Sequence, residues 1–79
     1  MRKPLEHYLG LEYPAVLVAE AEGGYTAFHP DLKGCVTVGE TEEEALANLG
    51  EARRLWLETA YEYGDEIPLP PVGLSGGVR

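Results

Sequence analysis

The sequence predicts an α+β fold in which a three-stranded antiparallel sheet carries one long helix on one of its faces (β-β-β-α). Three short runs of apolar and β-branched residues come first, separated by turn-forming glycines and prolines. A long segment with helical periodicity follows, which begins with a capping sequence and ends at a glycine. The chain has 79 residues, so we expect a single domain. Its parts are an N-terminal segment (1–12), the sheet (13–39), the helix (41–63) and a tail rich in proline and glycine (64–79).

The predicted sheet consists of a hairpin and one further strand. We expect the hairpin strands over 15–19 and 25–29, because Gly23 and Gly24 supply the positive φ angles that a tight turn needs. The connection that follows begins with Pro30 and ends with Gly34, which suits a left-handed conformation. Within it, Asp31 is expected to hydrogen-bond its own backbone. The third strand is expected over 35–39, where valine and threonine are frequent.

The predicted helix starts with a capping box. Thr41 caps the first free amides, Glu44 reaches back toward the N-terminus, and the two glutamates between them match the helix dipole. The helix is expected to end near Tyr63, because Gly64 suits a C-cap and Pro68 bars continuation. Because successive helix residues are rotated by about 100°, the apolar residues form one stripe along the helix, which Leu46 and Leu57 widen. The stripe consists of Ala45, Leu49, Ala52, Trp56, Ala60 and Tyr63.

Two residues of this helix depart from the pattern. Arg53 lies near the apolar stripe, so the aliphatic part of its side chain must lie along the core while its guanidinium group contacts water or a polar partner. Gly50 costs about 1 kcal/mol relative to alanine in a helix interior. This glycine predicts that another backbone approaches the helix closely.

Both faces of the predicted sheet are largely apolar, yet one helix can cover only one of them. In a simple register, one face carries Ala15, Leu17, Tyr25, Ala27, His29, Cys35 and Thr37. We assign this face to the helix, because its small residues allow close packing. The other face needs a second cover, either the N-terminal segment or another subunit, and we favour a dimer or tetramer. The predicted oligomer interface, here called the Val/Phe face, consists of Val16, Val18, Phe28, Val36 and Val38.

The N-terminal segment allows two interpretations. Pro4 suits the first position of a short helix that Gly10 would end, whereas an alternation of apolar residues over 5–11 would fit an extended segment. We favour the helix. Beyond the long helix, residues 67–72 are expected to lie extended against the body of the domain.

The charge balance excludes some classes of partner. With 14 acidic and 6 basic side chains the net charge is −8, so the average surface repels a phosphate backbone and attracts a basic protein. No segment is apolar enough for a membrane span or a signal peptide, and the single cysteine excludes an internal disulfide. We therefore expect a cytoplasmic protein that contacts neither membrane nor nucleic acid.

Several residue types could carry chemistry, but structural roles explain them better. The four acids of 40, 42, 43 and 44 could hold Mg²⁺, yet they sit around one helix start and do not converge from separate elements. Zinc ligation by His7, His29 and Cys35 lacks the paired spacing of structural sites. Asp31 and Cys35 could act as a catalytic acid and a nucleophile, but a turn residue and a buried hydrophobe are the more common roles. We predict no cofactor, no metal and no enzymatic activity.

The order of these motifs resembles the N-terminal domain of the HicB-like antitoxin family. The matching pieces cover residues 13–70 and are Tyr13-Pro14, Gly23-Gly24-Tyr25, Pro30-Asp31-Leu32-Lys33-Gly34-Cys35, Thr37-x-Gly39-x-Thr41-x-Glu43-Glu44-Ala45-Leu46 and Ile67-Pro68-x-Pro70. Lys33 stands where the family usually has proline. The resemblance implies a truncated ribonuclease H-like sheet without the catalytic carboxylates of that enzyme.

The resemblance also implies a partner. HicB-like antitoxins bind a small, basic, mRNA-cleaving toxin of the HicA type, and an acidic chain suits it. Complete antitoxins usually carry a C-terminal DNA-binding domain, which does not follow within residues 1–79. Two hypotheses stay open at this point. One is an interaction module that neutralises a ribonuclease toxin, and the other is a solitary homo-oligomer that binds a small ligand or is a vestigial nuclease.

Overall fold

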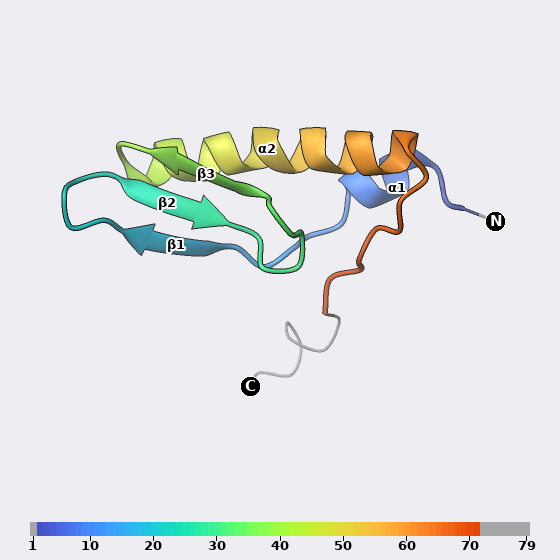
Figure 1. Cartoon of the computed structure of the whole chain (residues 1–79), viewed down its shortest axis with the longest axis horizontal. Coiled ribbons are helices and arrows are strands. Elements are labelled where there is room, and N and C mark those ends of the chain that lie inside the picture. The colour runs from blue at the N-terminus through green and yellow to red at the C-terminus, as the bar shows by residue number, and fades with distance from the viewer. Residues whose placement is uncertain (1, 72–79) are drawn as a thin grey trace.

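A computed structural model describes residues 2–71 and has the expected α+β fold. Strands β1 (Val16–Ala19), β2 (Tyr25–Phe28) and β3 (Val36–Gly39) form an antiparallel sheet in the order β1-β2-β3. The long helix α2 (Glu42–Glu62) lies across one face of this sheet and extends beyond it (Figure 1). The short helix α1 (Leu5–Leu9) packs beside the C-terminal half of α2 (Figure 1). The expected tail beyond residue 71 lies outside the described residues.

The sheet has the simple register that the sequence predicts. Leu17 pairs with Ala27, and Ala27 pairs with Thr37, without interruption along the four residues of each strand. The β1–β2 turn closes through backbone bonds, from the Gly23 amide to the Glu20 carbonyl and from the Glu20 amide to the Gly24 carbonyl, both at 3.0 Å. Positive φ angles occur at the expected glycines, which are Gly23, Gly24, Gly34 and Gly64.

The core lies between α2 and the sheet face that carries Leu17 and Ala27. Ala27 is completely buried, and so are Ala45 and Leu57 of α2. Leu17 packs against this cluster. The assignment of the small-residue face to the helix is therefore confirmed. The side chain of Leu32, in the connection before β3, is also fully buried, which local periodicity did not predict.

Both ends of α2 are capped. The Thr41 hydroxyl accepts a hydrogen bond from the Glu44 amide at 3.0 Å, as the capping box predicts. At the other end Tyr63 is the C-cap, one residue before the expected Gly64. Gly64 follows in the left-handed region and donates to the Tyr61 carbonyl, while Asp65 donates to the Ala60 carbonyl. These two bonds form a Schellman motif.

The buried stripe of α2 is shorter than expected. Ala45, Leu49, Leu57 and Ala60 are buried, but Tyr63 is 74 % exposed and Leu46 is 46 % exposed. Tyr63 was expected in the stripe, and this part of the prediction is wrong. The helix extends past the four-residue strands, so its last turn has no sheet beneath it (Figure 1).

The close approach of two backbones occurs at Gly39 and not at Gly50. A Cβ atom built on Gly39 would lie 2.7 Å from the Ala45 Cα and 2.9 Å from the Glu44 carbonyl carbon. A Cβ atom on Gly50 would meet only the Arg53 side chain, at 4.0 Å. The expectation for Gly50 was wrong, because helix α2 approaches the sheet most closely where β3 turns into it.

The two outer segments of the chain meet at the C-terminal end of α2. Pro4 is the N-cap of α1 rather than its first helical residue, and the Lys3 carbonyl accepts a hydrogen bond from the Tyr61 hydroxyl at 2.9 Å. The Arg2 guanidinium lies 4.0 Å from the centre of the Tyr61 ring. Beyond α2, Ile67 is buried, as expected for a segment that packs against the body.

Candidate functional site

The Val/Phe face remains uncovered within the described part of the chain. Pairing aligns Val16, Phe28 and Val36 in one row across the sheet, and Val18, Thr26 and Val38 in the next. The four valines are between 36 % and 64 % exposed. Helix α1, the alternative cover, lies against α2 instead (Figure 1). The structure thus brings the five predicted interface residues together on one apolar face, on which the four valines are exposed and Phe28 is half-buried.

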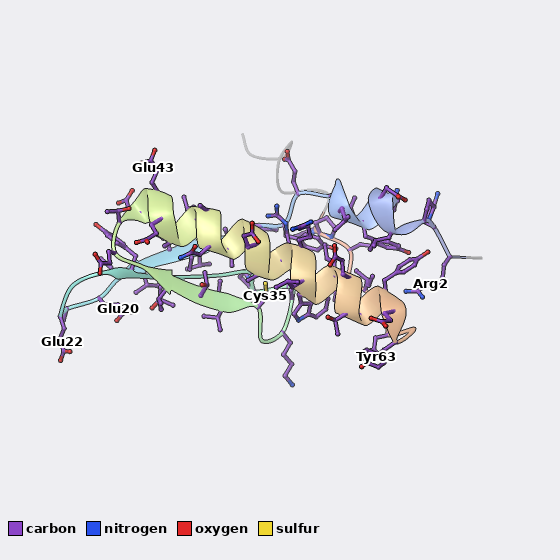
Figure 2. The ribbon with its side chains drawn as sticks, turned by 90° about the horizontal axis from the view of Figure 1, so that it is seen from above. Arg2, Glu20, Glu22, Cys35, Glu43 and Tyr63 are labelled. Atoms are coloured by element: carbon purple, nitrogen blue, oxygen red, sulfur yellow. The ribbon has the colours of Figure 1, made fainter. Side chains whose placement is uncertain are left out.

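Several acidic side chains lie at the end of the molecule where the hairpin turns and α2 begins. Figure 2 shows Glu20, Glu22 and Glu43 at this end, opposite Arg2 and Tyr63. Several of the acids have a structural partner within the fold. A Glu44 carboxylate oxygen accepts from the Glu40 amide at 2.6 Å, and Glu20 accepts from the Thr26 hydroxyl at the same distance.

The zinc candidates do not converge. His7 lies on the exposed side of α1, while His29 and Cys35 are buried on either side of the 30–34 connection. The His29 amide donates to the Cys35 carbonyl at 3.1 Å, so their link is through the backbone. Within residues 2–71, no group of three His, Cys, Asp or Glu side chains is arranged to hold a metal ion.

Asp31 is half-buried in the connection between β2 and β3, and this connection closes through backbone hydrogen bonds. The Leu32 amide donates to the His29 carbonyl at 3.0 Å, and the Cys35 amide donates to the Leu32 carbonyl at 2.9 Å. Burial of Leu32 anchors this connection to the core.

A buried polar junction joins four segments of the chain. His29 is 3 % exposed, and its Nδ1 donates to the Pro14 carbonyl at 2.9 Å. Its Nε2 then accepts from the Arg53 guanidinium at 3.4 Å, which gives Arg53 the partner that its position required. The Tyr13 ring packs edge-on against His29, and its hydroxyl donates to the Pro68 carbonyl at 2.7 Å. Sequence reasoning identified the anomaly at Arg53 but not this junction.

Ionisation is disfavoured at two groups near this junction. Burial raises the pKa of Tyr13 above its ordinary value, and the negative charge of Asp31 and the neighbouring Tyr8 raise it further. Burial also raises the pKa of the Cys35 thiol. Arg53 opposes both shifts but does not cancel them. Cys35 is therefore a protonated core residue beneath α2 rather than a reactive thiolate (Figure 2).

A groove runs between the start of β3 and the second half of α2. This β3–α2 groove has a volume of about 550 Å³. Its lining includes Cys35, Val36, Leu55, Trp56, Asp65 and Glu66. The Trp56 indole N–H donates to the Lys33 carbonyl at 2.8 Å, which fixes the ring against the connection before β3. The groove was not predicted, because its two walls come from segments far apart in the sequence.

Most of the chain that forms the sheet and α2 matches a known protein family. Residues 13–75 match the family described as the HicB-like antitoxin of bacterial toxin–antitoxin systems. The chain belongs to the HicB-like antitoxin family. The resemblance inferred from the sequence motifs is thereby confirmed, over nearly the same residues.

Relatives of this HicB-like chain include short and longer proteins. It is 45 % identical over 58 residues to a UPF0150 protein of Synechocystis, covering 73 % of this chain and 80 % of that protein. A UPF0150 protein of Thermoplasma acidophilum is 34 % identical over 58 residues, covering 73 % of this chain and 84 % of the relative. The protein named Antitoxin HicB 1 of Photorhabdus laumondii is 41 % identical over 64 residues, covering 80 % of this chain but 41 % of that protein.

Neither α1 nor α2, the helices of the described region, combines the length and the apolar character that a membrane crossing requires.

Proposed function

We propose that this HicB-like chain is a non-catalytic antitoxin that binds and neutralises a small, basic, mRNA-cleaving toxin of the HicA type in the cytoplasm. The observation that carries the proposal is the family match over residues 13–75. The net charge of −8 supports it, because an acidic chain attracts a basic partner and competes with RNA for the same surface.

A direct test uses a HicA-like toxin encoded in the same genome. The purified toxin is mixed with this chain at increasing ratios, and cleavage of a defined mRNA is followed. We expect cleavage to stop near one chain per toxin, and the chain alone to leave the RNA intact. Full toxin activity at a large excess of the chain would contradict the proposal and favour the solitary homo-oligomer.

The second part of the proposal is self-association, as a dimer or tetramer, through the Val/Phe face. A stable interface buries about 800 Å² per partner, against a total accessible surface of 5590 Å² for the chain. The exposed Val16, Val18, Val36 and Val38 form a contiguous apolar surface without a charged side chain among them, which supports burial against a second copy.

Sedimentation tests this part. The Val18→Lys, Phe28→Lys double variant is expected to sediment as a monomer, because each lysine would have to be desolvated in the interface. Leu46→Lys, which changes an exposed apolar residue of α2 outside this face, serves as the control and should stay oligomeric. An unmutated chain that sediments as an 8.6 kDa monomer at tens of micromolar would refute self-association.

A further inference from the structure

The outer edge of β3 offers main-chain hydrogen-bonding groups to the β3–α2 groove. The Val38 carbonyl accepts a hydrogen bond from the Asn48 side chain at 2.9 Å, so it faces away from β2. Alternate residues of a strand point their main-chain groups the same way. The amide and carbonyl of Val36 therefore also face outward, toward the groove. Within residues 2–71 no backbone group outside the sheet forms a hydrogen bond with either of them.

The two ends of this edge differ. At the Val38 end, the Asn48 side chain already donates to the Val38 carbonyl, so an added strand could not pair there. At the Val36 end, the edge opens into the groove, where the apolar side chain of Leu55 is 59 % exposed. An extended chain lying along this end could pair with Val36 and insert an apolar side chain beside Leu55 and Trp56. Strand addition to a sheet edge beside a helix is an established mode of peptide recognition.

The negative charge at the far end of the groove favours a basic ligand. Asp65 and Glu66 line this end and are exposed. Neither forms an ion pair within the described residues, where Arg54 pairs with Glu58 at 4.0 Å. Carboxylates beside an apolar groove favour a ligand with lysine or arginine next to its apolar residue. A second copy of this chain would instead bring another net charge of −8 to the same edge.

We propose that the β3–α2 groove binds an extended, basic segment of a partner protein as an additional strand beside Val36. The proposal rests on the proposed function only for the identity of the partner, which is then the toxin. This surface is separate from most of the Val/Phe face, since the added strand uses the edge of the sheet and not its open face. One oligomer can then carry a toxin on each subunit.

Trp56 provides the readout, because it is the only tryptophan of the chain and lines the groove. The probe is a blocked peptide of alternating lysine and valine without aromatic residues, titrated into the full chain while tryptophan emission is recorded. We expect a saturable change in Trp56 emission. A peptide of equal length with glutamate in place of lysine should give none. N-methylation of the peptide amides that face β3 should weaken binding about tenfold, as expected for a lost main-chain hydrogen bond.

A matched pair of variants tests the groove itself. Leu55→Ser is expected to lower the affinity for the basic peptide about tenfold. Leu46→Ser changes an exposed leucine of the same helix outside the groove, and this variant should bind the peptide with unchanged affinity. Both side chains are at least 46 % exposed, so neither change threatens the fold. Circular dichroism of both variants verifies this.

Three outcomes decide between the two proposals. The groove proposal is overturned if Trp56 does not respond to the basic peptide and Leu55→Ser inhibits the toxin as well as the unmutated chain. It is also overturned if Trp56 emission depends on the concentration of the chain and not on the peptide, since the edge would then pair two copies. If the peptide binds as expected but the unmutated chain fails to inhibit the toxin, the groove proposal stands and the antitoxin function falls.

Discussion

A methyl group added to Gly39 should destabilise the fold severely. The Cβ atom of Gly39→Ala would lie 2.7 Å from the Ala45 Cα and 2.9 Å from the Glu44 carbonyl carbon. Carbon atoms pack best at about 3.5–4.0 Å, so a gap close to 1 Å must open. The atoms it meets are helix backbone, which cannot rotate away as a side chain would. Helix α2 must therefore move off β3, which also strains the bond from Asn48 to the Val38 carbonyl.

The expected cost lies at the upper end of overpacking, about 3 kcal/mol. For a domain of this size, each kcal/mol lowers the melting temperature by about 4–8 °C, so we expect a fall of about 12–24 °C. Gly50→Ala is the matched control, because its Cβ atom meets only the end of the Arg53 side chain at 4.0 Å. Replacing a helix-interior glycine should stabilise by about 1 kcal/mol. The same chemical change thus has opposite signs at the two positions.

Thermal melts followed by circular dichroism measure both variants. They are recorded at several protein concentrations, because self-association would make the melting temperature depend on concentration. A Gly39→Ala variant that melts within about 2 °C of the unmutated chain would refute the argument from backbone contact. A strongly destabilised Gly50→Ala would restore the original expectation that a backbone approaches the helix there.

Three further predictions concern the cap, the junction and the absence of catalysis. Thr41→Ala removes the acceptor of the Glu44 amide and should cost about 1 kcal/mol, seen as a lower urea midpoint with an unchanged slope. Tyr13→Phe should cost about 1 kcal/mol, because the Pro68 carbonyl loses its donor. Since the pKa of Tyr13 is raised in the fold, its contribution to stability is present below the ordinary tyrosine pKa and is lost as the pH rises through the folded value. As the pH rises above the ordinary tyrosine pKa of about 10, the Tyr13→Phe variant should therefore lose less stability than the unmutated chain in denaturant titrations. Finally, we expect no Mg²⁺-dependent RNA cleavage by the purified chain; cleavage that disappears in Asp31→Asn would disprove the non-catalytic role.

The features that local sequence determines were predictable. The register followed from the alternation of Leu17 and Ala27 with the valines, and the start of α2 followed from Thr41 and Glu44, whose contacts span three or four residues. Strand ends differed by a residue, as at Val16, since the ends of elements depend on the neighbours they pack against.

The features that distant contacts determine were not predictable. Arg53 was recognised as anomalous, but its partner His29 lies 24 residues away, and no periodic pattern links the two. Leu32 appeared to be a turn residue, yet the fold buries it completely. Gly50 lies inside α2 and was recognised as unusual, whereas Gly39 lies at the end of β3, where a glycine is common. Only the tertiary packing shows that Gly39 is the one required.

The distant contacts of the outer segments have a consequence for the order of folding. The sheet and α2 form from pieces adjacent along the chain, and such low contact order favours rapid folding. The contacts of Arg2 and Lys3 with Tyr61, and of Tyr13 with Pro68, join residues 55–59 positions apart. Joining such distant residues costs loop-closure entropy, and the contacts offset this cost only after the sheet and α2 have formed. These segments therefore form the unit that docks last and opens first, so their amides exchange with solvent while the sheet stays protected.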